Sequence, residues 1–106
     1  MAETRSGPTG PGSVVLDIGG DVGALIIITP ARMAGEEIHV SPLGDPAGRT
    51  HALVRERRLG GTSSHAAVYP ALPAGDYTIW RDAGSPAGTV RIDGGAATSY
   101  RWAEPG

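Results

Sequence analysis

Short apolar and alternating stretches, separated by turns rich in glycine and proline, constrain the fold of this chain more than any other feature. They recur at intervals of about ten residues, and each ends at a cluster of Gly, Pro or Asp. Successive side chains of a strand point to opposite faces, so a period of two predicts half-buried strands. No window shows a sustained helical period. We therefore expect an all-β domain whose strands pack in two layers.

The pattern predicts eight strands, each bounded by a turn signal. Their expected ranges are 14–18, 22–29, 36–41, 50–59, 63–69, 76–81, 88–92 and 97–102. Residues 30–35 are expected to form a loop or a single helical turn, and Asp93-Gly94-Gly95 to join the last two strands as a hairpin. The prediction is a mostly antiparallel β-sandwich, immunoglobulin-like or transthyretin-like, over residues 13–104, preceded by a disordered tail over residues 1–12.

The turn centred on Asp45 predicts the register of one hairpin. Pairing around this centre places Ile38 opposite Ala52, so that small and apolar side chains share one face. His39 then lies opposite His51 on the other face.

The next turn, centred near Gly61, predicts that Arg57 pairs with His65 and Glu56 with Ala66. Together the two hairpins predict one polar outer face on three strands. Its members would be His39, His51, Leu53, Arg55, Arg57, His65 and Tyr69.

The three histidines are the first residues to consider as metal ligands. His39 and His51 would have Cβ atoms about 5 Å apart as a direct cross-strand pair. His65 would lie roughly 20 Å away along the strands, too far to share an ion with them. His39 and His51 are therefore weak candidates, solvated imidazoles are the default interpretation, and we expect neither metal nor cofactor.

The chain shows no arrangement typical of a catalytic site. It contains no Gly-x-Ser-x-Gly motif and no cysteine. Ser64 and His65 are neighbours on an expected strand and point to opposite faces. Acidic residues at the ends of strands commonly belong to turns. This explains Asp17, Asp21 and the pair Glu36-Glu37 without a catalytic role. We expect no catalytic residues.

Charge and hydropathy exclude several classes of partner. The chain has 9 basic and 11 acidic residues, without the basic excess of a protein that binds nucleic acid or a membrane surface. Met1–Gly12 lacks the apolar segment of a signal peptide, and the apolar run Ala24–Ile28 is far shorter than the roughly 20 residues of a membrane span. We expect a soluble, cytoplasmic protein.

Arginines and aromatic residues supply the candidates for an interaction surface. Arg55-Glu56-Arg57-Arg58 is the one basic cluster of the sequence. With so few large side chains available, Tyr77 and Trp102 are expected in the core. Trp80 fits either a core position or an exposed platform for a sugar or peptide.

The segment Val68–Ile79 contains the sequence L-P-A-G-D-Y-T-I. It resembles the L-P-A-G-x-Y signature of transthyretin-like and Cna-B-like sandwich modules, which include carboxypeptidase regulatory-like domains. The resemblance implies a tight turn at Gly75, a Tyr77 side chain that closes one end of the sandwich, and no catalytic residue. With Asp17–Leu25 and Tyr69–Tyr77, the chain is also similar to short uncharacterised actinobacterial proteins. Some of those carry a phospholipase label, which no residue set here supports.

We therefore expect a non-enzymatic interaction or accessory module. It would contact a protein partner or a second copy through an edge strand or a polar face. The candidate residues are Arg55, Arg57, His65, Tyr69 and Trp80. One alternative is a binder of small ligands or carbohydrates that uses an exposed tryptophan. A third is a weak metal-dependent or hydrolytic enzyme.

Overall fold

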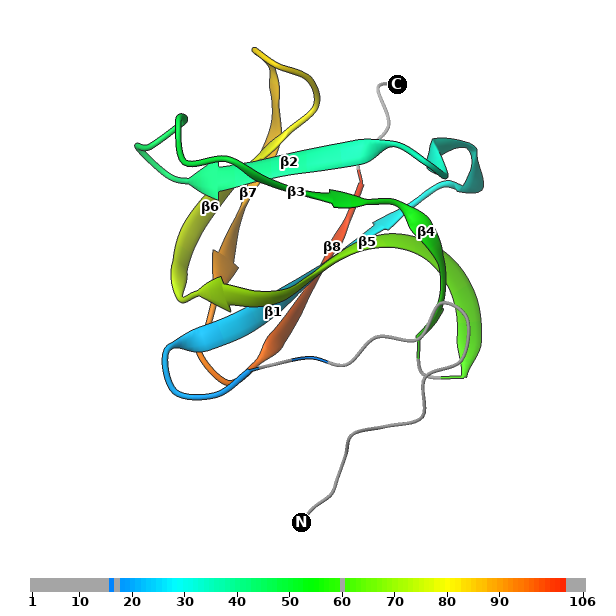
Figure 1. Ribbon diagram of the computed structural model, residues 1–106, viewed down its shortest axis with the longest axis horizontal. Coiled ribbons are helices and arrows are strands. Elements are labelled where there is room, and N and C mark those ends of the chain that lie inside the picture. The colour runs from blue at the N-terminus through cyan, green and yellow to red at the C-terminus, as the bar shows by residue number, and fades with distance from the viewer. Residues whose placement is uncertain (1–15, 17, 60, 103–106) are drawn as a thin grey trace.

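The computed structural model describes residues 16, 18–59 and 61–102 and folds them into two four-stranded β-sheets (Figure 1). The strands are β1 (Val22–Thr29), β2 (Glu37–Pro42), β3 (Thr50–Leu53), β4 (Arg55–Leu59), β5 (Thr62–Pro73), β6 (Gly75–Trp80), β7 (Pro86–Ile92) and β8 (Ala97–Arg101). Sheet A has the order β4-β5-β1-β8, and sheet B has the order β3-β2-β6-β7. All neighbours are antiparallel except β1 and β8, which run parallel. The expected all-β, mostly antiparallel sandwich is confirmed.

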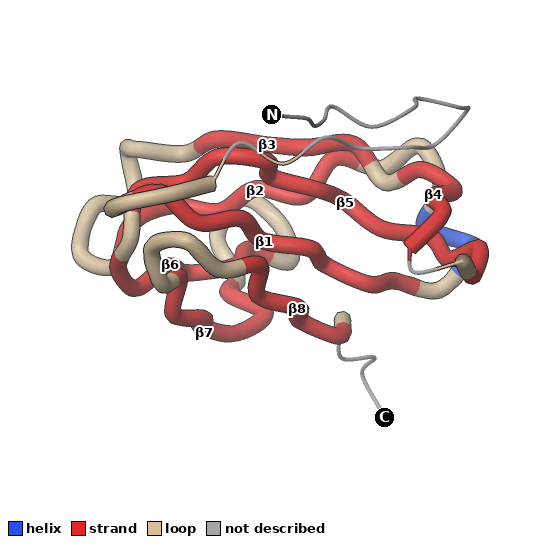
Figure 2. Tube along the Cα trace, turned by 90° about the horizontal axis from the view of Figure 1, so that it is seen from below, coloured by secondary structure: helices blue, strands red, loops and turns tan. Residues whose placement is uncertain are grey.

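A short 3-10 helix, η2 (Ala31–Met33), occupies the segment expected to be a loop or one helical turn. It lies at the same end of the molecule as β4 (Figure 2). In the part of the chain that the structure describes, no helix has the length and apolar character needed to cross a membrane.

The expected strand over residues 50–59 is instead two strands that belong to different sheets. Val54 separates β3 of sheet B from β4 of sheet A, and its side chain is buried. Its N–H donates to the Glu36 carbonyl and its own carbonyl accepts the N–H of Gly35, so the corner loses no backbone hydrogen bond. The chain crosses between the layers here because the apolar Val54 faces the core.

The next crossing uses the segment that carries the L-P-A-G-x-Y pattern. The turn expected over residues 70–75 is shorter than predicted, because β5 continues to Pro73 in sheet A and β6 begins at Gly75 in sheet B. Gly75 has a φ of +147°, a region that favours glycine. The Tyr77 hydroxyl donates to the Pro73 carbonyl over 2.7 Å, and the ring is buried. The tight turn expected at Gly75 is confirmed, and Tyr77 is a core residue. The role of Tyr77 in closing one end of the sandwich stays a prediction.

The hairpin expected between the last two strands is wrong. Residues 93–95 lead from β7 in sheet B to β8 in sheet A, where β8 pairs in parallel with β1 (Figure 1). The turn is packed tightly, because a Cβ at Gly94 would lie 1.9 Å from the Gly20 carbonyl oxygen. Residues 93–95 do form a turn, as predicted, but this turn connects the two sheets and not two neighbouring strands of one sheet.

The two predicted registers have different outcomes. The β2–β3 register is confirmed, with Ile38 opposite Ala52 and His39 opposite His51. The β4–β5 register is shifted by one residue, because Arg57 pairs with Ser64 and not with His65. A one-residue shift moves every affected side chain to the opposite face of the strand.

The core lies between the sheets and draws apolar side chains from both. Its buried members are Leu25, Ile27, Met33, Ile38, Val40, Val54, Ala67, Tyr69, Leu72, Tyr77, Ile79, Ile92 and Trp102. Tyr77 and Trp102 are therefore core residues, as predicted. Tyr69 also belongs to this core, which contradicts its predicted place on a polar outer face.

Two of the predictions concern residues outside or beside the described part of the chain. The tail over residues 1–12 lies outside the described residues. Of the expected strand over 14–18, Leu16 and Ile18 are described and neither belongs to a strand. An isolated bridge between Gly19 and Val22 forms the turn predicted before β1.

Candidate functional site

The outer face of sheet B collects polar and aromatic side chains from three adjacent strands. Alternation along β2 buries Ile38 and Val40 against the core and turns the residues between them outward. We define the sheet-B face as Glu37, His39 and Ser41 of β2, His51 and Leu53 of β3, and Thr78 and Trp80 of β6, with Arg49 before β3.

A histidine–carboxylate cluster lies at one side of this face. Glu37 and His39 are two residues apart on β2, and His51 is the cross-strand partner of His39. The imidazole rings stack with centroids 5.5 Å apart. The Glu37 carboxylate lies 3.9 Å from His39 Nε2 and 3.6 Å from His51 Nε2. One potential ligand atom from each residue lies within 4.8 Å of the others.

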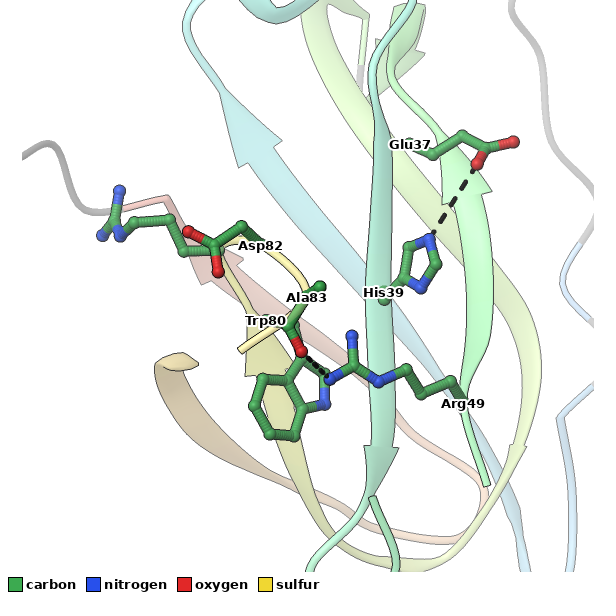
Figure 3. Close-up of a pocket in the computed structure, with 7 residues that line it drawn as sticks. Glu37, His39, Arg49, Trp80, Asp82 and Ala83 are labelled. Carbon is green, nitrogen blue, oxygen red and sulfur yellow. Dashed lines mark hydrogen bonds and ion pairs between the residues drawn. The ribbon is translucent and has the colours of Figure 1, made fainter. Parts of the chain in front are cut away.

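A stacked arginine covers the tryptophan next to this cluster. Trp80 is opposite His39 in the β2–β6 register, and the Arg49 guanidinium carbon lies 4.0 Å from the centre of its ring. The indole N–H donates to the Ser41 hydroxyl over 2.9 Å. Arg49 also donates to the Ala83 carbonyl over 2.6 Å, which links the loops before β3 and after β6 (Figure 3). The arginine is thus held by a cation–π contact and a hydrogen bond.

A shallow cavity of about 240 Å³ separates the cluster from the loop after β6. It is lined by Glu37, His39, Arg49, Trp80, Arg81, Asp82 and Ala83 (Figure 3). Asp82 fixes the loop by accepting the N–H groups of Gly84 and Ser85 at 3.0 and 2.9 Å. The hydrogen bond from Gly84 is the main cause that lowers the pKa of Asp82 below its ordinary value.

The predicted interaction residues do not lie together. Arg55 and Arg57 lie on the edge strand β4, on the face of sheet A that points away from the core. Arg57 donates from Nε to the Ala66 carbonyl over 3.3 Å. Burial, and then the charge of Arg55, lower the pKa of Arg57. Only Trp80 among the predicted residues belongs to the sheet-B face.

His65 and Tyr69 are placed differently from the prediction. Both share the core-facing side of β5 with Ala67, because the β4–β5 register is shifted by one residue. The buried Tyr69 hydroxyl donates to the Ile38 carbonyl of the opposite sheet. Burial raises the pKa of Tyr69 well above its ordinary value of 10.0. Tyr69 therefore stabilises the sandwich and is not available to a partner.

Sequence reasoning missed two residues of the site. Glu37 was predicted to belong to a turn at the end of a strand. Its spacing of two from His39 places both side chains on the same face of β2. That signal was present once the His39–His51 pair had been derived. Arg49 gave no comparable signal, because its contact with Trp80 depends on the pairing of β2 with β6.

Comparisons with known proteins add little to this geometry. Neither a family model nor a curated protein sequence matches the chain. Among solved structures, a leucine-rich repeat protein from Bacteroides thetaiotaomicron VPI-5482 is similar over 78% of this chain, with a TM-score of 0.49 and 13% identity. This chain spans 12% of that protein's length, and a similarity at this level carries no argument about function.

Proposed function

We propose that the domain is a non-enzymatic protein-interaction module and that the sheet-B face contacts the partner. The Arg49–Trp80 stack is the observation that supports this most directly. Tryptophan and arginine are the residue types that most often dominate binding energy at protein interfaces. Here they are stacked on a polar sheet face and held by hydrogen bonds from Arg49 to Ala83 and from Trp80 to Ser41.

The shape of the face favours a protein partner over a small ligand or carbohydrate. Its cavity of about 240 Å³ is smaller than the roughly 300–1,000 Å³ of typical ligand pockets, and it matches a partner side chain better. The Arg49 guanidinium covers one face of the Trp80 ring, which a sugar would need for stacking.

The same face offers little support for hydrolysis. Ser41 is the serine of this surface, but its side chain is buried and its oxygen accepts the indole N–H of Trp80. A nucleophile must be accessible and within hydrogen-bond reach of a base. A recognition role needs neither condition.

A pair of arginine substitutions tests the proposal. Arg49→Ala removes the stack, and Arg91→Ala removes an exposed arginine from the same sheet that pairs with Asp76 and Asp93. Immobilised wild-type and variant chains are used to capture proteins from a lysate of the source cells. Light scattering after size-exclusion chromatography of each purified chain tests for a second copy.

We expect at least one captured protein, or self-association, that is lost with Arg49→Ala and retained with Arg91→Ala. The proposal fails if the wild-type chain is a monomer and captures nothing. It also fails if both variants behave as the wild type does, because the stack then contributes nothing to binding.

A further inference from the structure

We infer that Glu37, His39 and His51 form a binding site for a divalent transition-metal ion, with zinc as the best match. The inference concerns the isolated chain and does not depend on the proposed partner. It rests on the placement of the three side chains and on the chemistry of their donor atoms.

The backbone already brings the three ligands together. The β2–β3 register pairs His39 with His51, and the spacing along β2 puts Glu37 on the same face. The inward pair Ile38–Ala52 fixes this register, because a shift by one residue would expose Ile38. No loop has to order for the three donors to converge.

The remaining distances are within reach of side-chain rotation. The donor atoms lie within 4.8 Å of one another, and donors of a tetrahedral zinc with bonds of about 2.0 Å are roughly 3.3 Å apart. The side chains of His39, His51 and Glu37 are 40%, 58% and 54% exposed, so each has room to rotate. The Nε2 atoms of both rings already lie within 3.9 Å of the Glu37 carboxylate, so small rotations suffice to bring the three donors to one ion.

The donor set selects the type of ion. Two imidazole nitrogens and one carboxylate oxygen are ligands that suit zinc, copper and nickel, whereas magnesium and calcium prefer an all-oxygen shell. Three protein ligands leave a fourth position toward solvent, as in open zinc sites. The Glu37 carboxylate supplies the acidic ligand of the cluster.

The two ring nitrogens of His39 differ in their surroundings. Its Nδ1 atom is buried and has no hydrogen-bond partner, while Nε2 approaches Glu37 at 3.9 Å, beyond hydrogen-bond distance. Nε2, the nitrogen nearer to Glu37, is therefore the atom of this ring that can share an ion with the carboxylate.

The surroundings limit the expected affinity. Arg49 and Arg81 line the cavity beside the cluster, and only Asp82 adds a negative charge there. Arg49 is tied to Trp80 and Ala83, which directs its charge toward them. We therefore expect binding in the micromolar range, weaker than the closed four-ligand sites that hold structural zinc.

Zinc titration of the full, tag-free chain tests the site. Isothermal calorimetry with zinc chloride, in a buffer that does not bind the ion, is run on the wild type, His39→Ala, His51→Ala and Glu37→Gln. His65→Ala is the matched control, because it removes the remaining histidine of the chain from a different strand. Circular dichroism confirms that each variant keeps the wild-type fold.

We expect one zinc per chain, and a loss of affinity of at least about tenfold in His39→Ala and His51→Ala. Glu37→Gln lowers the affinity less, and His65→Ala leaves it unchanged. Failure of the wild type to bind zinc would overturn the inference. So would an equal loss of affinity in His65→Ala, because the ion would then lie elsewhere.

Copper provides a second measurement that locates the ion. Trp80 is opposite His39 in the register, so Cu²⁺ at the cluster quenches its fluorescence, while Trp102 in the core is affected less. Trp102→Phe and Trp80→Phe isolate the two emissions. Stronger quenching of Trp80, abolished by His51→Ala, supports the site, and equal quenching of both tryptophans contradicts it. Neither measurement involves a partner, so the metal site and the proposed function can fail separately.

Discussion

The two faces of sheet B are built on one backbone but serve different purposes. The inner face presents Val40 and Ile79, both fully buried, to the core. The outer face presents His39 and Trp80 at the intervening positions of the same two strands. Alternation therefore places a residue that stabilises the fold next to one that is available for binding.

This contrast predicts that substitutions on the two faces differ in whether they affect stability or binding. A change on the inner face alters packing between the sheets, so its effect appears as lost stability. A change on the outer face removes contacts that are mostly exposed, so stability is largely retained and binding is altered. Neighbouring residues of one strand should therefore respond in opposite ways.

The largest difference is expected between Ile79 and its neighbour Thr78 on β6. Ile79→Ala removes a fully buried side chain and lowers the free energy of unfolding by about 2–5 kcal/mol. Thr78→Ala, on the half-buried outer face, changes it by less than about 0.5 kcal/mol. Urea denaturation followed by circular dichroism measures both, with Ile79→Val as a milder variant should the alanine variant not fold. Equal effects at the two positions would contradict the assignment of faces.

A smaller loss is expected from removing one hydroxyl between the sheets. Tyr69→Phe leaves the Ile38 carbonyl without the donor it has in the core, at a cost of about 1–3 kcal/mol. The matched control is Tyr100→Phe, whose half-buried hydroxyl lies 3.4 Å from the Ala87 carbonyl and should cost less. Chemical denaturation of both variants checks the order. A larger effect at Tyr100 would mean that the hydrogen bond between the sheets contributes little.

Alkaline pH should weaken the fold through the same residue. Burial raises the pKa of Tyr69 above 10.0, so the folded chain keeps a proton that the unfolded chain loses. Its contribution is complete below pH 10 and declines as pH rises toward the folded pKa, by up to about 1.4 kcal/mol per pH unit. Burial also raises the pKa of Tyr77, so Tyr69→Phe should flatten this decline without abolishing it. Denaturation midpoints between pH 8 and 11 measure the slopes, and identical slopes would exclude this role for Tyr69.

The same comparison shows how far the sequence predicts the structure. The outer pair His39–His51 was predicted because the β2–β3 pairing is centred on Asp45, as the turn signal in the sequence indicates. The inner position of Tyr69 was missed because a one-residue error in the β4–β5 pairing exchanged the faces. Leu59 pairs with Thr62, so the β4–β5 pairing is centred between residues 60 and 61 and not on Gly61. An error of half a residue in the centre of a turn is enough to exchange the two faces of a strand.

Contacts between layers were beyond the reach of pattern reasoning. Nothing in the residues around Val54 signals that the chain changes sheets there, because a buried corner and a buried strand position look alike in sequence. The Arg49–Trp80 stack depends on β2 pairing with both β3 and β6, which are far apart in the chain. Two of the three residues of the histidine–carboxylate cluster, His39 and His51, were predicted from local register, and the arginine beside the cluster required the assembled sheet.

The smallest effect on stability, and the clearest on the surface, is expected at Arg49. Arg49→Ala removes the stack on Trp80 and should lower the free energy of unfolding by no more than about 1 kcal/mol. In a Trp102→Phe background, where only Trp80 emits, acrylamide quenching should increase because the ring loses its cover. Arg91→Ala is the control, since this arginine pairs with Asp76 away from either indole. Unchanged quenching in Arg49→Ala would show that the guanidinium does not cover the Trp80 ring in solution. The stack that supports the outer face as a binding surface would then be absent.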